Sequence, residues 1–202
     1  MSTPTPLPGL RERKKARTRW AIQEHALRLF AEQGYDATTV DQIAAAADVS
    51  PSTFFRYFRT KEDVVVQDEF DDLLLEAYAV AGRAPDPVAS LRHSLVEALG
   101  DTPRSEVDKS MQRTALIATV PALRTRVVEN MLTSFEDAAA RFGEGVGRDQ
   151  DDPAVRAFVG ATLGALLPVL LEWAASGFEE DVADLVSRTF TGLAEVLHWR
   201  QG

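Results

Sequence analysis

Residues 49–58, VSPSTFFRYF, gather side chains that could bind a polyanion. Ser50, Ser52 and Thr53 carry hydroxyl groups that can hydrogen-bond to phosphate oxygens and base edges, and the guanidinium of Arg56 can do the same. The segment also holds four aromatic residues, Phe54, Phe55, Tyr57 and Phe58. They are a quarter of the aromatic residues of a chain with 10 Phe, 3 Tyr and 3 Trp. Either the segment forms a tightly packed small core, or some of its side chains face something other than protein.

Helical spacing separates these aromatic residues into two groups. Phe54 and Phe58 are four residues apart, so they share one helix face and are expected to point inward. Phe55 and Arg56 then point elsewhere, and Tyr57 lies at the flank. This outward set, together with the hydroxyl groups at the helix start, suits a helix whose N-terminal end enters the major groove of DNA.

Helical elements precede this segment. Apolar residues at spacings of three and four predict a helix over residues 13–33, and Gly34 ends it. Thr39 and Gln42 have the types and spacing of a capping box, which predicts a second, short helix that runs to Ala47.

The segment itself forms the third predicted helix. Ser50 is its N-cap, and Pro51 takes the first helical position, where a missing N–H does no harm. Thr60 caps a further helix. Residues 13–60 therefore predict a helix-turn-helix unit, in which two short helices pack at a steep angle against a longer first helix.

Composition indicates an ordinary soluble protein. Of the 202 residues 45% are hydrophobic and 26% are charged, and the lack of cysteine excludes disulfides and thiolate metal sites. No secretory signal is visible at the N-terminus. The longest nearly apolar run, residues 157–171, contains Pro168 and is short for a membrane span. We therefore expect a cytoplasmic protein without a membrane partner.

Charge is distributed unevenly along the chain. The net charge is −9, yet residues 1–61 carry ten Lys or Arg against six acidic residues, or +4, which leaves −13 for residues 62–202. A basic end on an acidic body predicts that only the N-terminal part meets a polyanion, although a solvated basic tail is the alternative.

The rest of the chain is predicted to be a larger helical domain. Segments rich in Pro and Gly divide residues 61–202 into six helical stretches, which gives an all-α protein of about nine helices. The predicted organisation is a flexible basic arm over residues 1–12, a helix-turn-helix head over residues 13–60, and the helical domain over residues 61–202.

The stretch TTVDQIAAAADVSPSTFFRYFRTKEDV, residues 38–64, resembles the DNA-binding signature of the TetR family of repressors. The matching positions are Thr39, Ile43, Ala44, Ala47, Val49, Ser50, Phe54, Tyr57, Phe58 and Lys61. The preceding LRLFAEQGYDATT also resembles the family's first helix and its exit. Two positions depart from the signature. Asp48 replaces a turn glycine, and aspartate tolerates a left-handed backbone better than most residues. Phe55 replaces a tyrosine, which removes a hydroxyl group.

This resemblance implies a set of DNA contacts. Thr39, Tyr57 and Lys61 would bind phosphates, and the third helix would meet bases or backbone. The implied DNA-binding residues are Thr39, Ser50, Ser52, Thr53, Phe55, Arg56, Tyr57 and Lys61. Further contacts are expected from the basic residues Arg11, Arg13, Lys14, Lys15, Arg17 and Arg19. The alternative role for Thr39 and Ser50 is helix capping alone.

The resemblance also implies a homodimer on a palindromic operator, because family members dimerise through a four-helix bundle of their last two long helices. Residues 153–175 and 181–199 are apolar enough for that role. The expected interface residues are Leu163, Leu167, Leu185, Phe190 and Leu193. Gly160, Gly164 and Gly192 would allow helices to approach closely.

A ligand that releases the repressor from DNA is a further implication. The expected pocket residues are Met111, Arg113, Leu116, Met131, Phe135 and Phe158. The small-molecule effector would be hydrophobic or acyl-CoA-like, and no cofactor is expected. The alternative is that these residues belong to an ordinary core.

Catalysis is not expected from this sequence. Glu195 and His198 have the spacing of helical di-iron proteins, but such sites need a second motif that the chain lacks. The remaining alternative to a repressor is a helical small-molecule-binding or adaptor protein without a specific operator.

Overall fold

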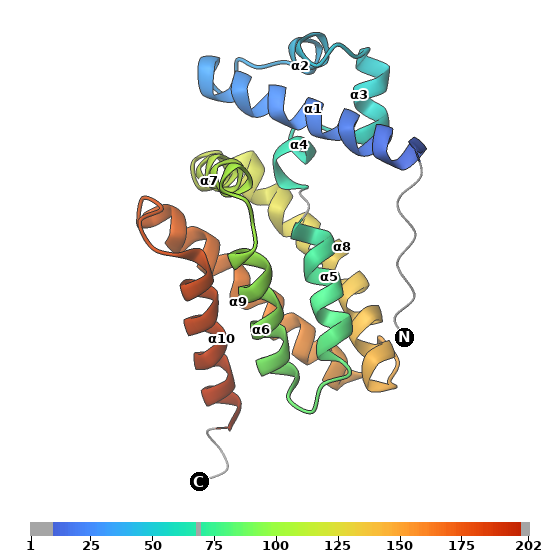
Figure 1. The fold of residues 1–202 in the computed structure, drawn as a ribbon, viewed down its shortest axis with the longest axis vertical. Helices are drawn as coiled ribbons and strands as arrows, with labels where there is room; N and C mark the ends of the chain where they lie inside the picture. The colour runs from blue at the N-terminus through green and yellow to red at the C-terminus, as the bar shows by residue number, and fades with distance from the viewer. Residues whose placement is uncertain (1–9, 68–69, 199–202) are drawn as a thin grey trace. The chain divides into compact units, whose positions relative to one another are not determined.

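The computed structural model describes residues 10–67 and 70–198, and the regular structure of these residues is entirely helical (Figure 1). The helices are α1 (Leu10–Gln33), α2 (Val40–Ala46), α3 (Pro51–Tyr57), α4 (Asp63–Val66), α5 (Phe70–Ala81), α6 (Pro87–Gly100), α7 (Arg104–Thr119), α8 (Pro121–Val146), α9 (Pro153–Ala175) and α10 (Val182–His198). The all-α prediction is therefore confirmed. The chain forms two compact units, Met1–Val65 and Val66–Gly202.

The described part of the chain has ten helices rather than about nine. The single further helix predicted after the Thr60 cap is instead two helices, α4 and α5. Helix α1 starts at Leu10, so residues 10–12, which were assigned to a flexible arm, are helical. Residues 1–9 lie outside the described part of the chain.

Local capping in the N-terminal unit follows the sequence closely. The Thr39 hydroxyl accepts the Gln42 N–H at 3.2 Å, and the Gln42 side-chain oxygen accepts the Thr39 N–H at 2.8 Å, which confirms the capping box. The Ser50 hydroxyl accepts the Thr53 N–H at 3.1 Å at the start of α3. Asp48, between α2 and α3, has a φ of 52°, the left-handed conformation in which the aspartate stands for glycine.

The core of the N-terminal unit is built from all four of its helices. Its buried members include Ile22, Ala26, Leu27, Phe30, Ile43, Ala44, Phe54, Phe58, Val64 and Val65. Fully burying one such large side chain stabilises the fold by about 1.5–3 kcal/mol. This core fixes α3, because Phe54 and Phe58 enter it from one face of that short helix and leave the opposite face outward.

The C-terminal unit packs α5, α6, α8, α9 and α10 around one core. Tyr78 is completely buried there, and its hydroxyl lies 2.7 Å from the Thr162 hydroxyl. The Thr162 hydroxyl donates its single proton to the Phe158 carbonyl oxygen at 2.8 Å. The Tyr78 hydroxyl is therefore the donor in its hydrogen bond to Thr162. Burial raises the pKa of Tyr78 above its usual range, and the residue is therefore a neutral donor.

The end of α5 approaches α8 at a pair of glycines, Gly82 directly after α5 and Gly145 within α8. A Cβ atom added to Gly145 would lie 2.8 Å from the Cα of Gly82, and one added to Gly82 would lie 2.6 Å from the Phe142 carbonyl oxygen. The two backbones approach too closely for any side chain. Gly164 and Gly192, which were expected to allow close approach, have nothing within 4 Å of such a Cβ inside the chain.

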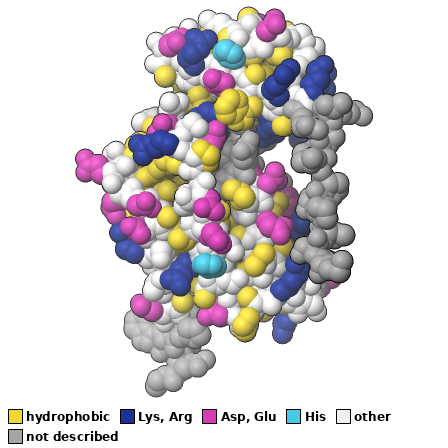
Figure 2. Space-filling view, in the orientation of Figure 1, with side chains coloured by type: hydrophobic (Ala, Val, Ile, Leu, Met, Phe, Trp, Pro, Cys, Tyr) yellow, Lys and Arg dark blue, Asp and Glu magenta, His cyan; other side chains and the backbone are white. Residues whose placement is uncertain are grey.

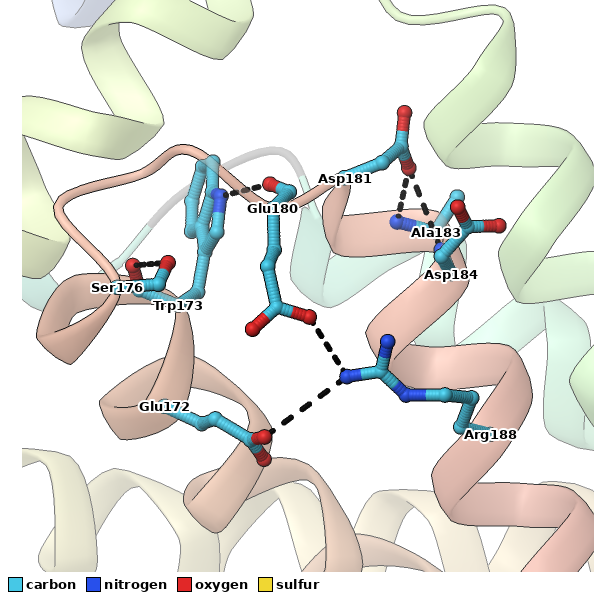
Figure 3. A network of polar contacts seen from close by, with 8 residues as sticks. All are labelled: Glu172, Trp173, Ser176, Glu180, Asp181, Ala183, Asp184 and Arg188. Carbon is cyan, nitrogen blue, oxygen red and sulfur yellow. Dashed lines mark hydrogen bonds and ion pairs between the residues drawn. The ribbon is translucent and has the colours of Figure 1, made fainter.

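The turn between α9 and α10 is held from both sides (Figure 3). The Trp173 indole N–H donates to the Glu180 carbonyl at 3.1 Å, and the Trp173 ring meets Phe178 edge to face. Phe178 has a φ of 64°, a left-handed conformation that few large residues adopt. On α10, the Arg188 guanidinium lies 2.7 Å from a carboxylate oxygen of Glu180 and 3.8 Å from one of Glu172. These contacts fix the relative direction of the last two helices.

Candidate nucleic-acid interface and effector domain

One face of α3 is exposed over its whole length. Ser52, Phe55 and Arg56 all lie on this face, whereas Phe54 and Phe58 are buried. Phe55 is 53% exposed, and its ring meets the buried Phe54 ring edge to face with centroids 5.4 Å apart. The predicted inward and outward groups of aromatic residues are therefore the ones observed.

The hydroxyl groups at the start of α3 bond to one another. The Ser50 hydroxyl lies 2.9 Å from that of Ser52 and donates to that of Thr53 at 3.0 Å. It also accepts the Thr53 N–H. The predicted hydroxyl groups thus lie together at the N-terminal end of the helix. The Ser50 hydroxyl is already hydrogen-bonded to neighbouring residues of its own chain.

Lys61 is placed differently from an outward-pointing phosphate ligand. Its ammonium donates to the carbonyl oxygens of Tyr35 at 2.8 Å and Thr38 at 3.0 Å. It also lies 4.0 Å from the centre of the Tyr35 ring. The Tyr35 hydroxyl in turn donates to a Glu62 carboxylate oxygen at 2.8 Å. Sequence reasoning missed this cluster, because Tyr35 and Lys61 are 26 residues apart.

Positive side chains also line α1. Lys14, Lys15 and Arg17 are exposed there, and the Arg19 guanidinium lies 4.9 Å from the centre of the Phe58 ring. The side chains of Arg11 and Arg13 lie outside the described part of the chain. Figure 2 shows Lys and Arg side chains on the visible face of the N-terminal unit together with some Asp and Glu, and many Asp and Glu side chains interspersed with Lys and Arg on that of the C-terminal unit.

The expected effector residues lie on α7, α8 and α9 of the C-terminal unit. Met111, Met131, Phe135 and Phe158 are half-buried against the core, Leu116 is half-buried on α7, and Arg113 is 9% exposed. Phe158 stacks on Phe142 with ring centroids 4.1 Å apart. The Arg156 guanidinium covers the Phe135 ring at 4.6 Å. Phe158 and Phe135 therefore each have an aromatic or cationic partner already within the chain.

Three of the five residues expected at a dimer interface lie elsewhere. Leu163, Leu185 and Phe190 are buried in the core of the same chain, and a side chain that is already enclosed cannot face a partner. Leu167 and Leu193 are half-buried. The amphipathic pattern correctly marked apolar helices, but it could not show which apolar face is turned inward.

Another face of α9 is exposed and apolar. Its exposed residues include Ala154, Ala157, Gly160, Ala161, Gly164, Pro168, Leu171 and Ala175. Helix α9 is long and apolar enough to cross a membrane by length and composition, but only 28% of its most apolar stretch is buried within the chain. The 23 residues of the helix exceed the 15-residue apolar run seen in the sequence, because the helix continues past Arg156 and Glu172, the charged residues that bound the run, and Pro168 lies inside it.

Comparison with protein families decides what these two units are. Residues 22–67 match the family described as bacterial regulatory proteins, tetR family. Residues 85–198, more than half of the chain, match the family described as the MftR C-terminal domain. The chain belongs to the TetR family of transcriptional regulators. The resemblance of residues 38–64 to that family's signature is thereby confirmed.

Individual TetR-family proteins agree with this assignment. The chain is 36% identical to the HTH-type transcriptional regulator TcmR of Streptomyces glaucescens over 157 residues, 71% of this chain and 68% of TcmR. It shares its fold with FadR of Thermus thermophilus in complex with lauroyl-CoA, with a TM-score of 0.51, 24% identity and coverage of 88% of this chain and 93% of FadR. It also shares the fold of SmeT in complex with triclosan, with a TM-score of 0.53, 17% identity and coverage of 87% and 91%. SmeT is a multidrug efflux pump repressor of Stenotrophomonas maltophilia.

As a TetR-family member, the chain is a DNA-binding transcriptional regulator with an N-terminal helix-turn-helix unit and a helical C-terminal domain. Its relatives are regulators rather than enzymes. Among the residues that the structure describes, no three His, Cys, Asp or Glu residues gather in a way that could hold a metal ion.

Proposed function

We propose that this TetR-family regulator is a ligand-released repressor that binds a palindromic operator as a homodimer in the cytoplasm. The observation that carries the proposal is the outward face of α3. A rigid core holds this short helix by Phe54 and Phe58 and leaves Ser52, Phe55 and Arg56 exposed. A helix presented in this way fits the major groove.

The proposed DNA contacts are divided by chemistry. Arg56 and the hydroxyl groups of Thr39 and Tyr57 would bind phosphates. Ser52 and Thr53 would reach base edges or backbone, and Phe55 would make an apolar contact in the groove. Ser50 contributes chiefly through its cap. The exposed cations of α1, Lys14, Lys15 and Arg17, would add contacts to the DNA backbone.

The proposed dimer uses the exposed apolar face of α9. This face has mostly small and apolar residues, with one exposed carboxylate, Glu172, near its C-terminal end, so two copies could pack closely on its remaining length. An operator with two half-sites needs two heads at fixed spacing, which a dimer supplies. The large exposed fraction of this apolar helix supports burial against a second chain.

The proposed effector is a hydrophobic small molecule that binds between α7, α8 and α9. FadR binds lauroyl-CoA and SmeT binds triclosan, and both share the fold. In this chain, half-buried Met111, Met131 and Phe135 supply adaptable apolar surface in the corresponding unit. The ligand would release the operator by binding more tightly to the conformation that fits DNA poorly.

Duplex DNA from the region upstream of the protein's own gene tests the proposal. Fluorescence anisotropy at two salt concentrations should show specific binding that weakens as salt rises, and a scrambled duplex of the same length should bind at least tenfold more weakly. Equal affinity for the two duplexes would favour the alternative, a small-molecule-binding or adaptor protein that has no specific operator.

A second arm of the same experiment tests ligand release. Lauroyl-CoA, dodecanoic acid and triclosan are added to the preformed complex as representative apolar ligands. Release of the specific duplex by any of them supports an apolar effector. Binding of one of them by calorimetry without any effect on DNA affinity would contradict the release mechanism.

A further inference from the structure

We propose that Lys61 is a positioning residue, which holds the turn before α2 and through it places Thr39, and that Lys61 does not itself contact DNA phosphate. This inference rests on the proposed DNA-binding function of the head. It changes the role that the family resemblance gives to Lys61.

The ammonium of Lys61 is occupied within the protein. An ammonium group has three N–H donors, and two of them are directed at the carbonyl oxygens of Tyr35 and Thr38, at 2.8 and 3.0 Å. The Tyr35 ring lies 4.0 Å away and adds a cation–π contact. Lys61 is half-buried in this arrangement. Within the described part of the chain, only the third N–H is left without a hydrogen-bond acceptor, so most of the hydrogen-bonding capacity of the ammonium is directed at the turn.

The turn that Lys61 holds is also bonded within itself and to α1, where the Gln33 side chain donates to the Thr38 hydroxyl at 3.1 Å and the Phe30 ring packs on the Tyr35 ring. The Thr38 hydroxyl donates to the Gly34 carbonyl at 2.8 Å, and the Thr38 N–H donates to the Tyr35 carbonyl at 3.3 Å. The Tyr35 hydroxyl is bound to Glu62, the neighbour of Lys61. Lys61 therefore contacts the backbone carbonyl and the ring face of Tyr35, and Glu62 binds the hydroxyl group of the same ring.

Burial and then the hydrogen bond to Glu62 raise the pKa of Tyr35 above its usual range. Partial burial alone would raise the pKa of Glu62, but hydrogen bonds, first that from Tyr35, lower it overall. The pair is therefore a neutral phenol that donates to a carboxylate, which is a strong hydrogen bond. It orients the ring over which the ammonium lies.

The position of Thr39 depends on this turn, which directly precedes it. Its preceding peptide group is the one whose carbonyl Lys61 holds, and its own N–H is used by the capping box with Gln42. If Lys61 releases the Thr38 carbonyl, the start of α2 can shift, and with it the Thr39 side chain. Arg56 and Arg59, by contrast, are exposed cations that remain available to phosphates.

The salt dependence of DNA binding separates positioning from direct contact. Lys61→Gln removes the charge but keeps an amide that can donate to carbonyls, and Lys61→Met removes both. Loss of one phosphate contact lowers the slope of log affinity against log salt by about 0.9 for each head. We expect Lys61→Met to weaken binding about tenfold at every salt concentration, the loss of one charge-assisted hydrogen bond, with an unchanged slope. Lys61→Gln should recover most of the affinity.

Arg56→Met serves as the matched control, because it removes an exposed cation from the same head and should reduce the slope. A reduced slope in both Lys61 variants would overturn the inference and restore the phosphate contact. A merely structural role is excluded by a double-mutant cycle: Thr39→Val should weaken binding much less in the Lys61→Met protein than in the wild type. Additive effects would contradict positioning through Thr39.

Amide hydrogen exchange gives a measurement that does not depend on DNA. In folded Lys61→Met protein, the amides of residues 34–42 should exchange at least tenfold faster, while those in the middle of α1 stay unchanged. Unchanged exchange over residues 34–42 would overturn the inference. If the exchange changes as expected and the wild type binds no duplex, the proposed function fails while the hold of Lys61 on the turn stands. If Lys61→Met does not fold, Lys61→Gln supplies both measurements.

Discussion

At the scale of single residues, Phe55 is the most informative departure from the family signature. It extends from the exposed face of α3, supported from behind by the Phe54 ring. The neighbouring hydroxyls of Ser50, Ser52 and Thr53 already bond to one another. A phenyl ring has no donor or acceptor, so the feature of the major groove that it can recognise is an apolar one, the 5-methyl group of thymine.

We predict that thymine methyl groups under α3 contribute to operator affinity. Replacing each thymine of a bound half-site in turn with deoxyuridine should identify one position at which binding weakens about fourfold, the effect of one buried methyl group. Phe55→Ala should bind both duplexes equally, whereas Phe55→Tyr should keep the preference. Fluorescence anisotropy measures all three proteins. Uniform tolerance of deoxyuridine by the wild type would contradict a methyl contact by Phe55.

The sequence predicts local roles of residues better than distant ones. The caps of Thr39 and Ser50 and the inward direction of Phe54 depend on neighbours within four positions, and all three are confirmed. The carbonyl contacts of Lys61 depend on a turn 23 to 26 residues away. No spacing rule indicates such a contact, because it exists only after three helices have packed together.

At the scale of helices, the close approach of the end of α5 to α8 depends on two glycines, Gly82 and Gly145. We predict that Gly145→Ala lowers the free energy of unfolding by about 1–3 kcal/mol, because the new methyl group would meet the Gly82 backbone and force the helices apart. Urea denaturation of the full chain measures the change. Gly100→Ala, at the end of α6 with nothing within 4 Å, is the matched control and should not destabilise the protein. Equal stability of the two variants would contradict the role of this close approach.

Helix type could be predicted from sequence, but helix pairing could not. The glycines expected to allow close approach were chosen by their spacing within the last two helices. The observed pair, Gly82 and Gly145, is 63 positions apart, with Gly82 directly after α5 and Gly145 within α8. The same limitation placed Leu163, Leu185 and Phe190 at a dimer interface, although they fill the core of their own chain. Periodicity shows that a face is apolar, and tertiary packing decides what covers it.

At the scale of the whole molecule, the two units differ in the charge and the apolar character of their surfaces. The basic residues of the N-terminal unit suit a polyanion, and the acidic surface of the C-terminal unit disfavours non-specific contact with DNA. One exposed apolar helix face in the C-terminal unit does not fit an acidic, solvated surface. Burial of the α9 face against a second copy would resolve this conflict and would supply the second head.

We therefore predict that a charge on the α9 face converts the protein to monomers. Ala161→Glu and Leu171→Glu each place a carboxylate among the exposed apolar residues of α9, where burial against a partner would be unfavourable. Sedimentation velocity at micromolar concentration should show a dimer for the wild type and a monomer for both variants. Alanine and glutamate are both good helix formers, so Ala161→Glu should leave the fold intact by circular dichroism. Operator affinity should fall when dimerisation is lost, because one head binds only one half-site.

Leu132→Glu, at an apolar position of α8 that is 68% exposed, is the control and should remain dimeric. A wild type that sediments as a monomer, or an Ala161→Glu variant that stays dimeric, would show that this face does not join the two subunits.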